Sequence, residues 1–410
     1  MTTDQFQFDT GPLGGNPDIF VGIRKAVKSG KKMPSMLMEI AKLRMGPGKL
    51  KPEEYFMYEL YDDDRFDAQT RKTFLSGTGK TYDSPWRVIA EDKPLMTSML
   101  KGLGLPVPET QGIYHRIRTF DGAAELRTPE DMVEFLRNQA VYPIFGKPFG
   151  SCQSKGTALL TNYDKASDQL IIGADQRVPV VEFADTVEKL NQPYMFQTKL
   201  QPHAEITKMI GPSVSCVRMF YISDDRGCSL LRAAWKIPAD SNSADNFWRD
   251  GNMLAGIDLE TGEIAKAVQR SGSSTAPVEK HPETGVNFSD MVFPDWDQML
   301  EVASTAALNI PDCHFQGWDI AMTDQGPVIL ELEADGGNPI LGQLCHDQGV
   351  LDERYQHALD YAVNREKRAK EAAKKQKMAK VKNSFAALSQ FKEAQDNLRE
   401  NADSTETDSE

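Results

Sequence analysis

Residues 317–333 read GWDIAMTDQGPVILELE and place three carboxylates on two apolar segments joined by a turn. The alternation around the turn at 323–327 is typical of a β-hairpin, in which Asp319 would lie close to Glu331. Glu331 and Glu333 are two residues apart and therefore share a face of the sheet. Clustered carboxylates raise one another's pKa unless a cation lies among them, and such oxygen ligands suit Mg²⁺. From this stretch alone, a metal site and a solvated acidic strand end are equal alternatives.

Composition and charge narrow the class of protein. The chain has 410 residues, enough for two or three subdomains, and a net charge of −13, which argues against a general nucleic-acid binder. No apolar run has the length of about 18 residues expected of a membrane helix, and residues 1–6 lack the pattern of a secretory signal. The five cysteines are dispersed, which favours reduced thiols over disulfides or a zinc site. We therefore expect a soluble, cytoplasmic protein.

The pattern of apolar residues changes along the chain. We expect an α+β protein with seven strands at 142–147, 157–161, 194–200, 214–223, 229–237, 317–323 and 328–333. Helices are expected from residue 51, from 84 to 102 and from 295 to 308, the first two with a proline in the first turn. The expected regions are an irregular arm (1–20), a mostly helical region (21–140), two α+β segments (141–205 and 206–355), a basic Ala/Lys-rich helix (356–400) and a disordered acidic tail (401–410).

The basic helix is the most strongly charged part of the chain. Residues 364–382 hold nine Lys or Arg and two Glu, a net charge of +7, with Met378 and Val381 as the only larger apolar residues. Such a segment could contact an anionic surface or polymer, although a solvated helix is the simpler interpretation.

A second region of chemical interest surrounds Lys147. A predicted strand delivers this lysine to a segment, 146–157, that is rich in glycine and serine and contains Lys155. Glycines let backbone N–H groups approach phosphate oxygens, so the segment could bind phosphate. It lacks the Gly-Lys-Ser/Thr of a P-loop, and a plain hairpin loop remains the alternative. Further along, the predicted strand at 194–200 and Glu205 could bind a nucleoside, or could be an ordinary surface strand.

The order of these features resembles the ATP-grasp superfamily, and specifically its sugar-transfer associated branch. The resemblance covers about residues 50–355 and is carried by the segments 215–219 (SCVRM), 245–247 (DNF), 256–262, 281–285 (HPETG), 294–297 (PDWD) and 317–321 (GWDIA). It implies an ATP-grasp fold, in which two α+β subdomains clamp ATP, with acids on the last strands holding Mg²⁺ or Mn²⁺. A helical N-terminal region would precede the clamp and a charged C-terminal helix would follow it.

The resemblance also implies roles for individual residues. Lys93 and Lys147 would contact the phosphates of ATP, beneath a loop made by Gly150, Ser151, Lys155 and Gly156. Gln197, Lys199 and Leu200 would face the adenine, and Glu205 would hold the ribose. Arg218 and Lys236 would stabilise the transferring phosphoryl group or a substrate carboxylate, with Asn246 as a further substrate contact. Asp319, Glu331 and Glu333 would bind the metal.

One position departs from the family pattern. The family usually has Glu-Gly-Asn where this chain has Glu331-Leu332-Glu333, so an acid replaces the asparagine. The extra negative charge should tighten Mg²⁺ or Mn²⁺ binding, and Asn338 could supply the missing amide instead.

The reaction implied by the resemblance is an ATP-dependent ligation of a carboxylate to an amine through an acyl phosphate. The substrates would be small molecules, for example a sugar acid, an amino acid or a group on a polysaccharide. Two alternatives are an ATP-grasp phosphotransferase acting on a hydroxyl group and a non-catalytic nucleotide-binding scaffold. No histidine near the predicted site offers itself as a phosphate acceptor, which favours ligation.

Overall fold

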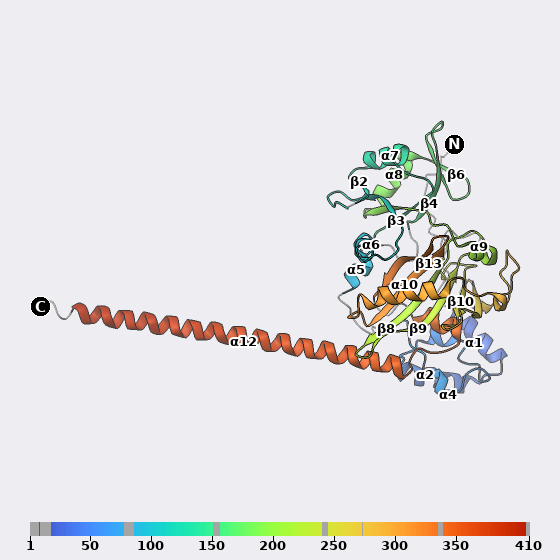
Figure 1. The fold of residues 1–410 in the computed structure, drawn as a ribbon. Helices are drawn as coiled ribbons and strands as arrows, with labels where there is room; N and C mark the ends of the chain where they lie inside the picture. Colours follow the sequence, from blue (N-terminus) through green and yellow to red (C-terminus); the bar gives the residue numbers. More distant parts are fainter. Residues whose placement is uncertain are drawn as a thin grey trace. The chain divides into compact units, whose positions relative to one another are not determined.

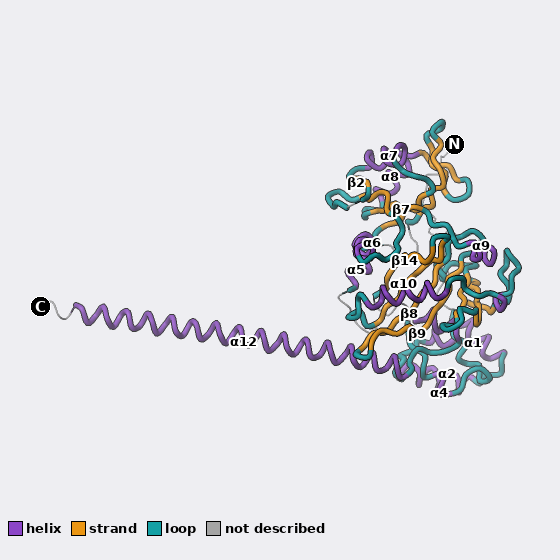
Figure 2. The backbone as a smooth tube through the Cα atoms, viewed as in Figure 1, coloured by secondary structure: helices purple, strands orange, loops and turns teal. Residues whose placement is uncertain are grey.

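The computed structural model describes residues 8, 18–77, 86–120, 122–150, 156–239, 245–272, 274–334 and 339–406. The chain divides into two compact units, Met1–Ala358 and Leu359–Glu410, and each is described by itself. Figure 1 shows the elements in chain order, and Figure 2 separates the helices from the strands. None of the described helices combines the length and the apolar character that a membrane crossing requires.

The first unit begins with short helices, three of which start at an aspartate that caps their backbone N–H groups. They are α1 (Ile19–Lys28), α2 (Met33–Met45), α3 (Pro52–Met57), α4 (Ala68–Arg71), α5 (Arg87–Glu91) and α6 (Lys93–Gly102). The helix predicted over 84–102 is in fact two, because Asp92 leaves helical geometry and accepts a hydrogen bond from the amide of Leu95. Aspartate favours this capping position, and Pro94 needs no N–H partner in the first turn. The break places Lys93 at the first position of α6.

The first sheet has seven strands in the order β2-β1-β7-β3-β4-β5-β6. These strands and the helices α7 and α8 of the same region are β1 (Thr110–Tyr114), β2 (Ala124–Leu126), α7 (Pro129–Asn138), β3 (Ile144–Pro148), β4 (Ala158–Asp164), β5 (Gln169–Ile172), β6 (Gln176–Pro179), α8 (Val180–Lys189) and β7 (Tyr194–Thr198). Phe135 of α7 and Phe183 of α8 pack with Phe196 of β7 in one core. The region that was expected to be helical, 21–140, therefore holds two strands of this sheet. Both are short, and β1 finds its partner in β7, about eighty residues later.

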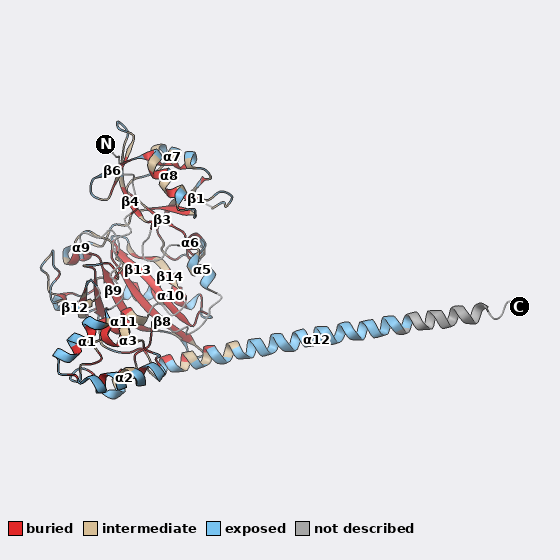
Figure 3. Ribbon diagram, turned by 180° about the vertical axis from the view of Figure 1, so that it is seen from behind, coloured by how far each residue is buried: buried red, intermediate tan, exposed pale blue. Residues whose placement is uncertain are grey.

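The second sheet also has seven strands, in the order β12-β11-β10-β9-β8-β13-β14. The elements of this region are α9 (Ala204–Ile210), β8 (Cys216–Asp224), β9 (Gly227–Ile237), β10 (Met253–Ile257), β11 (Ile264–Ser271), β12 (Ser274–Pro277), the 3-10 helix η1 (Phe288–Asp290), α10 (Trp296–Leu308), β13 (Phe315–Thr323), β14 (Gly326–Glu333) and α11 (Pro339–His346). The apolar face of α10 packs Met299 and Ala303 into a core with Trp235 and Trp318. Figure 3 shows the strands β8 and β13 as largely buried.

The predicted acidic hairpin is present as β13 and β14. Thr323 pairs with Gly326, which leaves a two-residue loop at Asp324-Gln325, and Gly326 has a φ of 101° that favours glycine. All seven predicted strands and the helix predicted at 295–308 are found, with ends shifted by at most a few residues. The structure is thus an α+β fold with two sheets, as expected.

The second unit consists of most of α12 (Glu353–Glu406). No glycine or proline occurs between its ends, and each added residue extends the helix by one hydrogen bond. The helix expected at 356–400 is therefore present, and it continues through residue 406 into the tail for which we expected disorder. Residues 407–410 lie outside the described part of the chain.

Candidate active site

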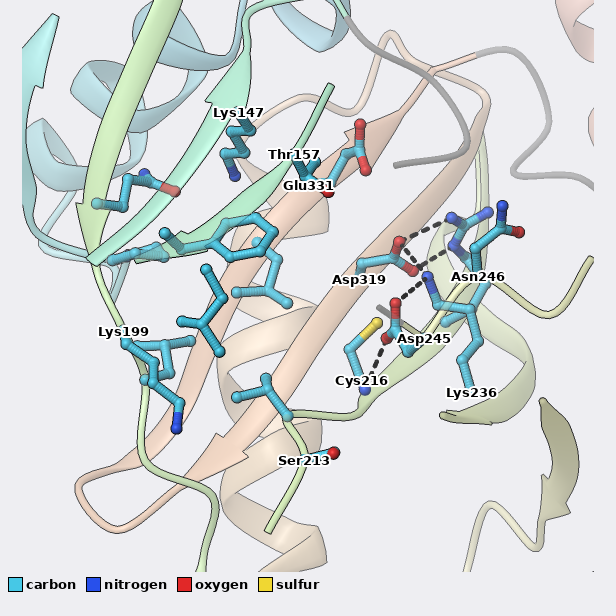
Figure 4. A pocket seen from close by; sticks show the side chains of 18 of the residues that line it. Lys147, Thr157, Lys199, Ser213, Cys216, Lys236, Asp245, Asn246, Asp319 and Glu331 are labelled. Carbon is cyan, nitrogen blue, oxygen red and sulfur yellow. Dashed lines mark hydrogen bonds and ion pairs between the residues drawn. The ribbon is translucent and has the colours of Figure 1, made fainter. Parts of the chain in front are cut away.

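Most of the predicted site residues line one cavity of about 770 Å³ in the first unit. Its lining comes from both sheets, from α6 and from the segments that follow β7 and precede β8 and β10. Eleven predicted residues line it, namely Lys93, Lys147, Gln197, Lys199, Leu200, Arg218, Lys236, Asn246, Asp319, Glu331 and Glu333. In Figure 4, Lys147 extends from the first sheet towards Glu331, while Lys236 and Asp319 meet on the second sheet.

The remaining predicted residues have other positions. Gly150 and Gly156 flank the segment 151–155, which lies outside the described residues, so the structure does not place Ser151 or Lys155. Gly156 has a φ of 75°. Glu205 is in the first turn of α9, where it pairs with Lys208 at 2.6 Å and does not line the cavity. Its role as a ribose contact stays a prediction.

Strand register brings the carboxylates of the hairpin together. Asp319 lies opposite Glu331, as the turn pattern predicted, and Gly317 lies opposite Glu333. The three carboxylates do not, however, converge as tightly as a ready-made ligand set. Among the described residues, the only three-ligand cluster found within 4.8 Å is Asp224 and Asp225, at the β8–β9 turn, with His357 of α12.

Two cations hold Asp319 in place. Arg218 lies opposite Asp319 on the neighbouring strand and donates to both of its carboxylate oxygens, at 2.5 and 2.8 Å. Lys236 of β9 donates to Asp319 Oδ2 at 2.8 Å. Arg218 also pairs with Glu333, at 2.8 Å. One guanidinium therefore joins two of the three predicted metal ligands.

The buried charges shift one another's proton affinities. Burial alone would raise the pKa of Asp319, but Arg218 and Lys236 outweigh it and hold this pKa below its ordinary value. The pKa of Glu333 is raised, because burial and the neighbouring acids outweigh the attraction of Arg218. Burial would lower the pKa of Lys236, yet Asp245 and Asp319 raise it well above its usual range. Asp319 is therefore ionised and Lys236 is protonated at neutral pH.

A pair of lysines, Lys93 and Lys147, also lines the cavity. Lys93 Nζ is 3.0 Å from Glu331 Oε1 and donates to the carbonyl of Phe149 at 3.2 Å. Lys147 is partly buried, and its burial together with the charge of Lys93 lowers its pKa to about 8. The charges of Lys93 and Lys147 repel each other, and an anionic ligand between the two lysines would offset this repulsion.

The donor set fits a divalent cation. Glu331 is a third exposed and projects into the cavity, where its ion pair is with Lys93. A carboxylate has about four lone-pair positions, so Asp319 and Glu333 can accept a further bond besides those from Arg218. Oxygen ligands of this type suit Mg²⁺.

Asp245 and Trp248 are among the cavity residues that were not assigned a role from the sequence. Asp245 accepts a hydrogen bond from the amide of Cys216 at 3.0 Å and lies 3.7 Å from Lys236 Nζ. Trp248 borders the cavity and stacks against Arg270. The sequence signal was the DNF segment at 245–247, in which only Asn246 was singled out. Asn246 Nδ2 is buried and has no hydrogen-bond partner among the described residues.

Two sheets that share a cavity, with lysines on one side and a carboxylate hairpin on the other, define an ATP-grasp architecture. The model of the sugar-transfer associated ATP-grasp family matches residues 78–358, and the chain belongs to this family. No curated protein matches the sequence.

Solved structures with related folds are distant. An L-amino acid ligase from Bacillus licheniformis is 13% identical with a TM-score of 0.34, and the match covers 66% of this chain and 48% of the ligase chain. A D-alanine–D-alanine ligase from Helicobacter pylori is 11% identical with a TM-score of 0.37, covering 68% and 61%. A D-Ala:D-Ser ligase from Enterococcus faecalis is 13% identical with a TM-score of 0.36, covering 67% and 61%. The chain thus spans about half the length of the first of these ligases.

Proposed function

We propose that this protein is an ATP- and Mg²⁺-dependent carboxylate–amine ligase that acts on small molecules, such as a sugar acid, an amino acid or a group on a polysaccharide. The observation that carries the proposal is the meeting of Lys93 and Lys147 with Glu331 and Asp319 across one cavity. Two lysines can bind polyphosphate, while the carboxylates opposite them can hold the metal that accompanies it.

The chemistry needs no nucleophile from the protein. A substrate carboxylate oxygen attacks the γ-phosphorus of ATP, the bond to the β–γ bridging oxygen breaks, and ADP leaves. The amine then attacks the carbonyl carbon of the acyl phosphate, phosphate leaves with the bonding electrons, and the amine nitrogen loses a proton. The protein contributes position and charge neutralisation.

The residues of the cavity divide between these tasks. Lys93 and Lys147 bind the phosphates. Asp319, Glu331 and Glu333 would hold Mg²⁺, which supplies charge neutralisation on the transferring phosphoryl group. Arg218 and Lys236 lie behind these acids, where they orient Asp319 and offset its charge.

The purine would bind beside β7. Gln197 is buried at the cavity wall, and its side-chain oxygen can accept a bond from an adenine amino group. The amide of Lys199 already donates to the carbonyl of Pro143 at 3.1 Å. We therefore assign the purine edge to the carbonyl of Lys199 and the amide of Leu200, with the ribose towards Glu205.

The carboxylate substrate would bind near Asn246. Its Nδ2 is a buried donor with no hydrogen-bond partner among the described residues. Leaving such a donor unsatisfied reduces the stability of the protein by about 1–3 kcal/mol. A substrate carboxylate or carbonyl would meet this need, and Lys236 lies in the same wall of the cavity.

The test is a screen for ADP release over amino acids and sugar acids, with ATP, Mg²⁺ and several amines. Hydroxylamine in place of the amine should trap the acyl phosphate as a hydroxamate. The Lys147→Ala variant should lose the signal, while Lys189→Ala, which changes an exposed lysine of α8, should keep it. ADP release with a phosphorylated hydroxyl product and no hydroxamate would favour a phosphotransferase. ATP binding without turnover for any pair would favour a scaffold.

A further inference from the structure

The helix α12 presents an apolar stripe beside its basic segment. Five large apolar side chains on it are between 45% and 67% exposed, namely Met378, Val381, Phe385, Leu388 and Phe391. Their spacings of three and four residues place them along one side of the helix, because an α-helix turns once every 3.6 residues. In Figure 3 this part of α12 is drawn as exposed around the helix.

The charge around the stripe has one sign. Between residues 374 and 392 the chain has six lysines and no aspartate or glutamate, whereas the whole chain carries a net charge of −13. At helical spacing, Lys380 flanks the stripe on one side and Lys375 and Lys382 flank it on the other, while Lys377 lies on the same side of the helix as the stripe, one turn before Val381. Long lysine stems can lie along apolar surface while their ammonium groups reach outwards.

We propose that residues 374–392 of α12 dock on the surface of an anionic lipid bilayer. A helix with aromatic and leucine side chains on one face and lysines beside them lies in the interface between headgroups and acyl chains, with the apolar face down. Negative headgroups attract the lysines at the same time. The charge of the segment is thus complementary to the surface that its apolar stripe would enter.

The main alternative role for the apolar stripe is to form a coiled coil with a second copy of the chain. The stripe fills apolar core positions over only two heptads, from Met378 to Leu388, and the core positions on either side are Lys374 and Lys392. A stable coiled coil needs apolar residues over about three or four heptads. Six lysines on each of two paired helices would also repel each other.

Full-length protein should be sedimented with vesicles of phosphatidylcholine alone and of equimolar phosphatidylcholine and phosphatidylglycerol. We expect binding to the second only, weakened on the order of tenfold or more by salt or by changing Lys374, Lys375 and Lys377 to Gln. The triple variant Phe385→Ser, Leu388→Ser, Phe391→Ser should lose binding to the same extent. A matched control, Ala379→Ser, Ala386→Ser, Gln390→Ser, puts as many serines on the opposite side of the helix and should bind as the unchanged protein does.

Several outcomes would overturn the proposal. One is that the protein sediments with neither kind of vesicle, and another is that it binds both kinds equally. A third is that the apolar-to-serine variant and its matched serine control lose vesicle binding to the same extent. Light scattering after gel filtration measures the molar mass of the protein and so tests the alternative of a coiled-coil dimer. A dimer that dissociates only in the apolar variant, together with an absence of vesicle binding, would show that the stripe pairs two copies of the chain instead.

Discussion

Arg218 and Asp319 face each other on the adjacent strands β8 and β13, and their side chains form a two-point ion pair that is 4% exposed. The same guanidinium reaches Glu333 at 2.8 Å, and Lys236 reaches the same aspartate at 2.8 Å. Asp319 and Glu333 are therefore compensated by cations from β8 and β9. This arrangement connects the stability of the second sheet to the geometry of the candidate metal site.

Removing Arg218 should destabilise the protein strongly. In Arg218→Met, Asp319 and Glu333 would lose their shared partner, and breaking a buried pair from one side costs about 3–5 kcal/mol. The free energy of unfolding in urea, followed by tryptophan fluorescence, measures the loss. The control is Arg87→Gln, which removes an exposed pair with Glu91 and should change stability by less than about 1 kcal/mol. Equal effects of the two substitutions would show that the buried pair contributes no net stability.

Lys147 should make stability depend on pH. Its pKa is lowered from 10.5 to about 8, so the unfolded chain binds more protons than the folded one between these values. The contribution of Lys147 to the free energy of unfolding therefore rises with pH between about 8 and 10.5, and it is lowest below about pH 8. Lys147→Met should be more stable than the unchanged protein at neutral pH, by roughly 3 kcal/mol at most, with a difference that shrinks towards pH 10.5. Urea titrations over this range test the trend, with Lys189→Met as an exposed control. A difference that does not vary with pH would contradict it.

Nucleotide binding should have the opposite pH dependence. If Lys147 contacts the phosphates, its loss of charge above a pKa of about 8 should weaken ATP binding as pH rises through this value. Calorimetric titration of ATP measures the change. Lys147→Arg keeps its charge over the whole range, so its affinity should stay nearly level. A parallel decline in both proteins would place the titrating group elsewhere.

The acidic hairpin was more predictable from sequence than the short strands β1 and β2. The hairpin could be predicted because the turn at 323–327 and its flanking apolar runs are local signals, and register then brings Asp319 to Glu331. By contrast, β1 and β2 were missed within a region that looked helical. Strands of five and three residues carry little periodicity, and the partner that stabilises β1 is β7.

The electrostatic partners of the site residues could not be read from sequence. The role predicted for Arg218 towards substrate or phosphate stays a prediction, whereas its pairing with Asp319 and Glu333 was not foreseen. That contact depends on the pairing of β8 with β13, which joins segments about a hundred residues apart. Asp245 was missed as a cavity residue for a similar reason, since it reaches Lys236 and Cys216 from a connecting segment.

Glu331 should be required for turnover but not for folding. Its side chain is a third exposed, so Glu331→Gln should change the free energy of unfolding by no more than about 1 kcal/mol. Loss of its charge should abolish Mg²⁺-dependent ADP release. Glu301→Gln, on the exposed side of α10, is the matched control and should retain activity. Full Mg²⁺-dependent activity in Glu331→Gln would show that this residue is not a metal ligand.

Glu333 should set the affinity for the metal. It replaces the asparagine of the family pattern, and its negative charge lies beside Asp319 and Glu331, so Glu333→Asn should raise the concentration of Mg²⁺ or Mn²⁺ needed for half-maximal ADP release. Loss of one ionic contact of about 1.5–3 kcal/mol corresponds to an increase of roughly ten- to a hundredfold. Glu333→Gln separates charge from length, because it is neutral and keeps the reach of glutamate. If charge is the cause, both variants should shift alike. An unchanged metal requirement in both would mean that Glu333 serves Arg218 alone, as its 2.8 Å ion pair already allows.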